Sequence, residues 1–146
     1  MTQPARRILG IDPGRVRIGL AISDPLGVIA QGLPTLQTKN LDSSLAAIAA
    51  LVLEREIGEI VVGCPRNLDG SRGAMTGFAE RIAEDLRQRT GLPVRLWDER
   101  LSSAEAERTL IEGEVRREDR ARLRDRLAAV LILQGFLDRR SSEGAT

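Results

Sequence analysis

The fold of this chain is decided by the stretch Ile8-Leu9-Gly10-Ile11-Asp12-Pro13-Gly14 and by the Arg15-Val16-Arg17-Ile18-Gly19-Leu20-Ala21 that follows it at once. An apolar run ends on a carboxylate, a Pro-Gly turn follows, and a second alternating run begins. The Pro-Gly pair favours a chain reversal, so we expect two short antiparallel strands with Asp12 at the mouth of the hairpin. Small residues in the second run would let another backbone or a ligand approach closely. The acid has two interpretations, a cap of a turn or helix and a ligand of a metal or phosphate.

The length and composition indicate one domain of a soluble globular protein. The chain has 146 residues, of which 42% are hydrophobic and 29% charged, as is typical of soluble globular proteins. A chain of this length can bury a hydrophobic core without stabilisation by disulfides or metals. We expect a single domain over residues 1–138 and a flexible tail over 139–146. The lone cysteine, Cys64, excludes an internal disulfide framework and suits a reducing compartment. No apolar run approaches membrane-spanning length, so a cytoplasmic protein without membrane contact is expected.

The cations are almost all arginine. The net charge is only +1, and Lys39 is the only lysine. Arginine binds phosphate oxygens through two parallel hydrogen bonds, which suits nucleic acid. A GC-rich genome, which raises Arg and Ala codons together, explains most of the bias without function. The arginine-rich run from Arg116 to Arg126 is interleaved with acids, and a solvated, salt-bridged helix is the ordinary interpretation of that run.

Hydrophobic periodicity predicts the remaining elements. A third strand is expected over 28–36, and a helix over 41–56 with Asp42 or Ser43 as its N-cap. A buried strand over 60–64, a helix ending near 90 and a strand over 94–98 follow. A capping box opens a helix over 102–111, and the last helix runs over 119–138. This order predicts an α/β fold: a mixed sheet of antiparallel hairpin strands and parallel strands, with helices on both faces.

Four acids stand out at positions where ligands collect. Asp12, Asp98 and Glu99 lie at the carboxyl ends of strands, where open α/β sheets bind ligands. Asp125 shares a helical stripe with the apolar Ala129 and Ile132, so it faces the core side, where an unpaired carboxylate is costly. A neighbouring arginine such as Arg100 is the structural explanation. A divalent cation is the functional one, if Asp12, Glu99 and Asp125 converge.

Such a triad is what two-metal phosphodiester hydrolysis requires. The two ions stand roughly 3.5–4 Å apart, one activating water and the other stabilising the leaving oxygen. Each acid alone is more often structural, but their joint placement favours metal ligation by Asp12, Glu99 and Asp125, with Asp98 as a further catalytic candidate. The chain contains no histidine, so acid–base work would fall to carboxylates, metals or solvent.

Basic and amide side chains near these acids are candidates for contacts with phosphates. They lie in the first turn, in the glycine-punctuated loop from Pro65 to Gly73, after Glu99 and in the arginine-rich run. An ordinary strand-to-helix turn capped by Ser71 explains the loop equally well. The candidates are Arg15, Arg66, Asn67, Arg72, Arg100, Arg116, Arg117 and Arg120.

Four ordered motifs resemble the YqgF family of Holliday-junction-resolvase-like nucleases, within the RNase H-like superfamily. The resemblance covers about Arg7 to Asp138, with two small departures, Cys64-Pro65-Arg66 in place of a more usual Leu-Pro-Leu and the charged Arg126. The motifs are Gly10-Ile11-Asp12-Pro13-Gly14 with Gly19 and Ala21; Val62-Gly63-Cys64-Pro65-Arg66-Asn67-Leu68-Asp69-Gly70; Asp98-Glu99-Arg100-Leu101-Ser102-Ser103; and Asp125-Arg126-Leu127-Ala128-Ala129-Val130-Leu131-Ile132-Leu133-Gln134.

The resemblance implies an RNase H-like fold, dependence on Mg²⁺ or Mn²⁺, and a hydrolase that matures the 5′ end of precursor 16S rRNA during ribosome biogenesis. Resolution of branched DNA is the rival role that it offers. The related resolvases carry an acid on the strand that ends here at Cys64, and this chain has none there, which leaves Glu99 or Asp98 to supply the ligand.

Two further classes of function stay open. The opening hairpin also resembles the phosphate-binding hairpin of actin-like ATPases and sugar kinases, although those enzymes close two such domains around ATP. A non-catalytic RNA-binding module of ribosome assembly is the other alternative. The sequence leaves open a homodimer, the choice between RNA and DNA, and the choice between endonuclease and exonuclease action.

Overall fold

The computed structural model describes residues 6–65, 69–99 and 117–144, with the backbone alone for 117–126 and 143–144. The expected helix over 102–111 and the candidate residues Arg66, Asn67, Arg100 and Arg116 lie outside the described residues. Within that part of the chain, no helix combines the length and the apolar character needed to cross a membrane.

The described strands form one mixed sheet in the order β3-β2-β1-β4-β5. The strands β1, β2 and β3 pair antiparallel, and β4 and β5 continue the sheet in parallel with β1. The mixed sheet expected from the sequence is therefore confirmed. The strands are β1 (Arg7–Asp12), β2 (Arg17–Ser23), β3 (Ala30–Gln37), β4 (Ile57–Cys64) and β5 (Val94–Asp98).

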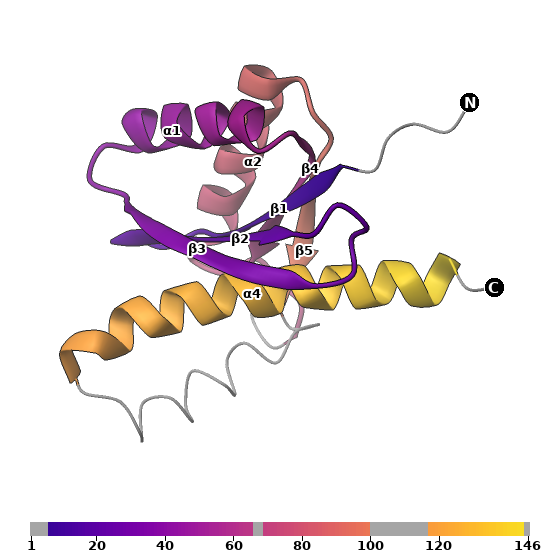
Figure 1. Ribbon diagram of the computed structural model, residues 1–146. Coiled ribbons are helices and arrows are strands. Elements are labelled where there is room, and N and C mark those ends of the chain that lie inside the picture. Colours follow the sequence, from indigo (N-terminus) through magenta and orange to yellow (C-terminus); the bar gives the residue numbers. More distant parts are fainter. Residues whose placement is uncertain (1–5, 66–68, 100–116, 145–146) are drawn as a thin grey trace.

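Helices cover both faces of the sheet (Figure 1). The helices α1 (Leu41–Glu54) and α2 (Thr76–Thr90) pack on one face, and the long helix α4 (Arg117–Gly144) crosses the other. Each face has its own buried cluster. The larger cluster includes Leu9, Ile11, Ile48, Val62, Cys64, Ile82 and Leu86; the smaller includes Ile8, Val61, Ala129, Ile132, Leu133, Phe136 and Leu137.

The opening hairpin forms as the sequence predicts. Leu9 pairs with Ile22 and Asp12 pairs with Gly19, so the acid is the last residue of β1. The turn requires glycine for lack of space, because a Cβ on Gly14 would stand 2.2 Å from the carbonyl oxygen of Arg17. Asp12 is thus fixed at the carboxyl end of the strand by a turn that tolerates no side chain at this position.

Two helix boundaries differ from those expected. The N-cap of α1 is Asn40, whose side chain accepts a hydrogen bond from the Ser43 amide at 3.0 Å, and neither Asp42 nor Ser43 takes that role. The helix α4 continues beyond the expected end at Asp138 to Gly144, through residues expected to be a flexible tail. Arg140 explains the extension, because its guanidinium bonds to Glu59 at 2.8 Å and lies 4.7 Å from the Phe136 ring centroid.

Contacts at two levels show that α4 runs antiparallel to β4. Arg140, near the end of the helix, is paired with Glu59 near the start of the strand. Ile132, further back on the helix, packs against Gly63 near the end of the strand. The amino-terminal half of α4 therefore points toward the edge of the sheet where β1 and β4 end.

Candidate active site

Asp12 lies on the face of the sheet that α4 covers. Side chains alternate along a strand, and Ile8 packs with α4 in the smaller cluster. A Cβ on Gly10 would stand only 2.7 Å from the Cβ of Leu133, so Gly10 also faces the helix. By the same alternation Asp12 is on that face, and it is only 6% exposed. A carboxylate this buried needs strong polar compensation.

The register of β5 separates the two neighbouring acids at its end. Asp98 pairs with Cys64, which belongs to the cluster under α1 and α2. Trp97 pairs with Gly63 and packs edge-on against Phe136 of α4, with ring centroids 5.7 Å apart. Asp98 is thus directed to the α2 side of the sheet. Glu99 follows Asp98 directly and belongs with the opposite, α4 side.

The Glu99 carboxylate reaches over the end of β4. Its Oε1 lies 3.1 Å from the point where a Cβ on Gly63 would stand. The register of the parallel pair, in which Ile11 faces Val62, places Asp12 beside Gly63 on the next strand. Adjacent strands are about 4.8 Å apart. The structure therefore brings the Glu99 carboxylate to the strand that neighbours Asp12, on the same face of the sheet.

Asp125 occupies a helical position at the same end of the sheet. Gly10 faces α4 between Ala129 and Leu133. A strand advances about 3.3 Å per residue and a helix about 1.5 Å, so the two-residue step from Gly10 to Asp12 corresponds to about four residues back along the antiparallel helix. This register brings helical position 125 close to the level of Asp12. The side chain of Asp125 lies outside the described residues.

The acids that are described suit a hard divalent cation. Carboxylate oxygens are the ligands that Mg²⁺ and Mn²⁺ prefer. Asp12 at the end of β1 and Glu99 just after β5 supply them on one face of the sheet. Among the described side chains, no group of three or more acids, cysteines or histidines is assembled into a metal site. A third protein ligand would therefore have to come from a side chain such as that of Asp125.

Two of the predicted phosphate contacts are described, and both lie around this edge. Arg15 is exposed in the turn after β1, and its Nε donates to the Met75 sulfur at 3.1 Å, just before α2 begins. Arg72 pairs with Glu80 at 2.5 Å, and its side chain remains 61% exposed. Arg117 and Arg120 lie in the first turns of α4, without described side chains. The described cations therefore border the edge that carries Asp12 and Glu99.

Thr76 anchors the loop that follows β4. Its hydroxyl donates to the carbonyl of Pro65 at 2.7 Å and accepts from the Gly73 amide at 2.8 Å. The side chain is completely buried. The sequence instead suggests Ser71 as a cap, but Ser71 bonds to Asp69 through both its amide and its hydroxyl. Both ends of the loop, Pro65 and Gly73, are thus bonded to Thr76 at the start of α2.

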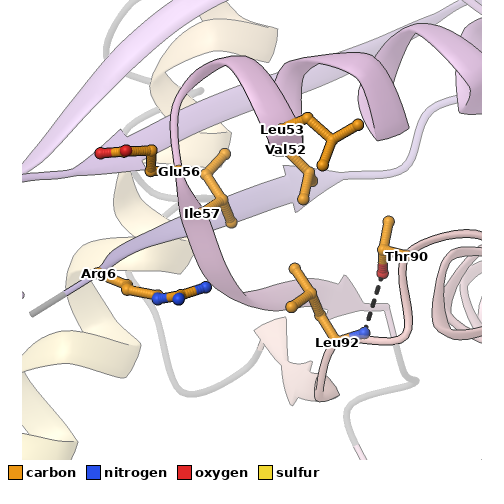
Figure 2. A pocket seen from close by; sticks show the side chains of 7 residues that line it. All are labelled: Arg6, Val52, Leu53, Glu56, Ile57, Thr90 and Leu92. Atoms are coloured by element: carbon orange, nitrogen blue, oxygen red, sulfur yellow. Dashed lines mark hydrogen bonds between the residues drawn. The ribbon is translucent and has the colours of Figure 1, made fainter. Parts of the chain in front are cut away.

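A cavity of about 350 Å³ lies at the opposite end of the sheet, between the end of α1 and the start of β4 (Figure 2). Apolar side chains dominate its lining. The Thr90 hydroxyl in its wall accepts from the Leu92 amide at 3.2 Å and donates to the Leu86 carbonyl. The Thr90 hydroxyl is therefore already engaged by the backbone, and the cavity lies at the other end of the strands from Asp12 and Glu99.

Sequence patterns did not identify the structural role of Gly63. The signal was present, because glycine interrupts the apolar run Ile60-Val61-Val62 and often marks a close approach in a strand. Glu99, just after β5, and Ile132 of α4 approach it, and both contacts depend on strand and helix registers that the sequence does not reveal.

Comparison with known families gives a match along nearly the whole chain. Residues 6–139 match the RuvX family, described as Holliday junction resolvase. A protein of Koribacter versatilis is 51% identical over 134 residues, covering 92% of this chain and 88% of its own. One from Moorella thermoacetica is 45% identical over 138 residues, covering 94% and 99%. Both carry a provisional name, pre-16S rRNA nuclease.

The fold has a solved counterpart. The Thermus thermophilus RuvC structure in complex with a Holliday junction substrate superposes with a TM-score of 0.60 at 18% identity, covering 94% of this chain and 96% of that one. At this identity the likeness shows a shared RNase H-like architecture.

Proposed function

The chain belongs to the RuvX family, and from that premise we propose that it is a metal-dependent nuclease that hydrolyses phosphodiester bonds of precursor 16S rRNA at the 5′ end. The observation that carries the proposal is the placement of Asp12 and Glu99 on one face at the carboxyl edge of the sheet. The provisional names of its relatives support RNA as the substrate.

In this proposal Asp12, Glu99 and Asp125 hold two ions of Mg²⁺ or Mn²⁺. When bound, such ions activate water and stabilise the oxygen that leaves the phosphorus. Asp12 would be the fixed point of the site, because it pairs with Gly19 of β2 and ends a strand that β4 holds on the other side. Glu99 would supply its carboxylate across β4, and Asp125 would supply the third from α4.

The same three acids would also determine the electrostatics of the site. Three carboxylates gathered in one place repel one another unless cations neutralise them. With no histidine in the chain, the protein offers no imidazole as general base. Asp98, on the α2 side, would orient the segment that follows it and would have no part in ligation.

Substrate binding is assigned to basic and amide side chains. Arg15 and Arg72, together with Arg66, Asn67, Arg100, Arg116, Arg117 and Arg120, would contact phosphates of the substrate. The Arg72–Glu80 pair leaves the guanidinium exposed, and an exposed ion pair is weak enough to exchange its partner for a phosphate. Action in the cytoplasm and a homodimer are further parts of this proposal.

Branched DNA is the second candidate substrate, supported by the family's description and the shared architecture. The deciding experiment gives the purified protein, with Mg²⁺ or Mn²⁺, a precursor 16S leader RNA and a four-way DNA junction of equal length. We expect cleavage of the RNA at the 5′ end and none of the junction. Cleavage of the junction alone would overturn the choice of substrate, and cleavage of neither would favour a non-catalytic RNA-binding module.

A further inference from the structure

Gly63 interrupts β4 at a position where a side chain is expected. The three residues before it are β-branched and buried. Its backbone needs no glycine, because the positive φ angles among the described glycines occur at Gly27, Gly70 and Gly91. Glycine weakens a strand, since it loses more conformational freedom and packs no side chain. The reason for glycine at this position must be the space that it leaves.

Two side chains use that space. A Cβ on Gly63 would lie 2.5 Å from Cδ1 of Ile132 and 3.1 Å from Oε1 of Glu99. The first atom belongs to the packing of α4 on the sheet, and the second to the proposed metal site. Gly63 is thus the point at which helix packing and carboxylate placement meet.

Gly63 lies between the two proposed ligands, Asp12 and Glu99. Gly63 separates Asp12, on β1, from Trp97 and the chain that continues to Glu99, on β5. To serve the same ion as Asp12, the Glu99 side chain has to cross the strand between them. A side chain at position 63 would stand in that path, on the face that Asp12 and Glu99 share.

We propose that Gly63 is a positioning residue of the metal site: its missing side chain lets the Glu99 carboxylate extend over β4 to the ion held by Asp12. The proposal rests on the metal site of the proposed function. A methyl group at position 63 would push Oε1 away from its present place, and ligand distances are held to about 0.2 Å in metal sites. The expected loss is therefore in metal affinity.

The test separates this effect from core packing. In the full-length protein, Ile132→Val removes the Cδ1 atom that a methyl group would strike, and it serves as the reference. Gly63→Ala and Glu99→Gln are then added to it singly and together. Mn²⁺ binding to the four proteins is measured by isothermal titration calorimetry, and cooperative thermal unfolding verifies that each is folded. If Gly63→Ala fails to fold, the series is repeated on Ile132→Ala, which leaves more room.

The double-mutant cycle has a definite expectation. Gly63→Ala should weaken Mn²⁺ binding about tenfold when Glu99 is present, the usual scale for losing the support of a ligand, and should have almost no effect once Glu99→Gln is in place. Unchanged affinity after Gly63→Ala, or an equal loss in both backgrounds, would overturn the role of Gly63 while leaving the proposed function intact. Unchanged affinity after Glu99→Gln would overturn the assignment of Glu99 and this inference with it.

Discussion

Gln134 on α4 accepts a hydrogen bond from the backbone amide of Ala30, the first residue of β3, at 2.9 Å. The same side chain donates to the Val28 carbonyl at 2.9 Å. The side-chain amide of Gln134 therefore offers one acceptor and one donor to the backbone at the start of β3, as the backbone of a neighbouring strand would. Apolar contacts hold α4 to the sheet without direction, whereas this pair of hydrogen bonds, together with Arg140 and Glu59, fixes its position along the sheet.

Gln134→Met should consequently destabilise the protein. The substitution keeps the length of the side chain but removes its hydrogen bonds to the half-buried Ala30 amide and to the exposed Val28 carbonyl. An ordinary hydrogen bond contributes about 0.5–1.5 kcal/mol, so we expect a loss of about 1–2 kcal/mol. Chemical denaturation would measure the change in the free energy of unfolding. Gln88→Met is the matched control, because Gln88 makes only an exposed 3.4 Å contact with Glu84, and it should change stability by less than about 0.5 kcal/mol. Equal losses in the two variants would contradict the role of Gln134.

Gly10→Ala should destabilise the fold through α4. The new methyl group would stand 2.7 Å from the Leu133 Cβ, an atom close to the helix backbone that cannot rotate away. Overpacking of this kind costs about 1–3 kcal/mol. Gly77→Ala is the matched control, since its nearest contact would be Arg72 at 3.6 Å and alanine favours the helix by up to about 1 kcal/mol. Thermal melts measure the change. An equal fall in the melting temperature of both variants would refute the close approach of α4 to β1.

Asp24 should make stability depend on pH in the acid range. Backbone amides of Ile29 and Val28 donate to its carboxylate at 2.8 and 2.7 Å, and they hold its pKa below the ordinary 3.8. A lowered pKa in the folded state gives stability that is present above the unfolded pKa and is lost as pH falls through the folded value.

The variant Asp24→Asn removes that titration. It should be less stable than the wild type at about pH 5, and the gap should close as pH is lowered toward about 2. Thermal melts over this range measure it. A gap that stays constant with pH would show that the carboxylate's charge has no part in holding the turn.

Mn²⁺ should stabilise the folded protein through Asp12. An ion that binds only the folded state adds about 2.7 kcal/mol at a concentration one hundred times its Kd, and it relieves the repulsion among the acids. The rise in melting temperature should disappear in Asp12→Asn. It should persist in Asp98→Asn, whose acid lies on the other face of the sheet. The opposite pattern would place the ion on the α2 side.

The arginine-rich run should set the salt dependence of substrate binding. Replacing Arg116, Arg117 and Arg120 by Gln would remove three phosphate contacts, so the slope of log K against log salt should become shallower by about 2 to 3. Binding to a precursor RNA at several salt concentrations measures that slope. Arg55→Gln, at the end of α1, should leave it unchanged. If the triple replacement leaves the slope unaltered, the arginine-rich run is an ordinary solvated helix that does not contact phosphates.

The hairpin and the helix-covered sheet could be predicted because their signals are local. The Pro-Gly turn and the alternation around it specify the hairpin without reference to distant residues. The stripe of Ala129, Ile132 and Phe136 likewise predicts which face of α4 is buried. Such patterns are consistent with the structure because each element must hide its own apolar side.

The features that the sequence does not predict depend on contacts between residues far apart in the chain. The choice between Asp98 and Glu99 depends on the register of β5 against β4, which no local pattern encodes. The extension of α4 depends on a pairing of Arg140 with Glu59 across 81 positions. The N-cap of α1 is ambiguous in the sequence because Asn40, Asp42 and Ser43 are all cap-forming residues, and only the backbone path selects Asn40.

The most direct test of the account is metal-dependent cleavage of the precursor 16S leader by four proteins: the wild type, Asp12→Asn, Glu99→Gln and Asp98→Asn. Loss of a metal ligand removes several kcal/mol of transition-state stabilisation, or roughly a thousandfold in rate. We predict losses of this size for Asp12→Asn and Glu99→Gln, with substrate binding retained, and a much smaller loss for Asp98→Asn. Wild-type cleavage by Asp12→Asn, or an essential Asp98 beside a dispensable Glu99, would contradict the account.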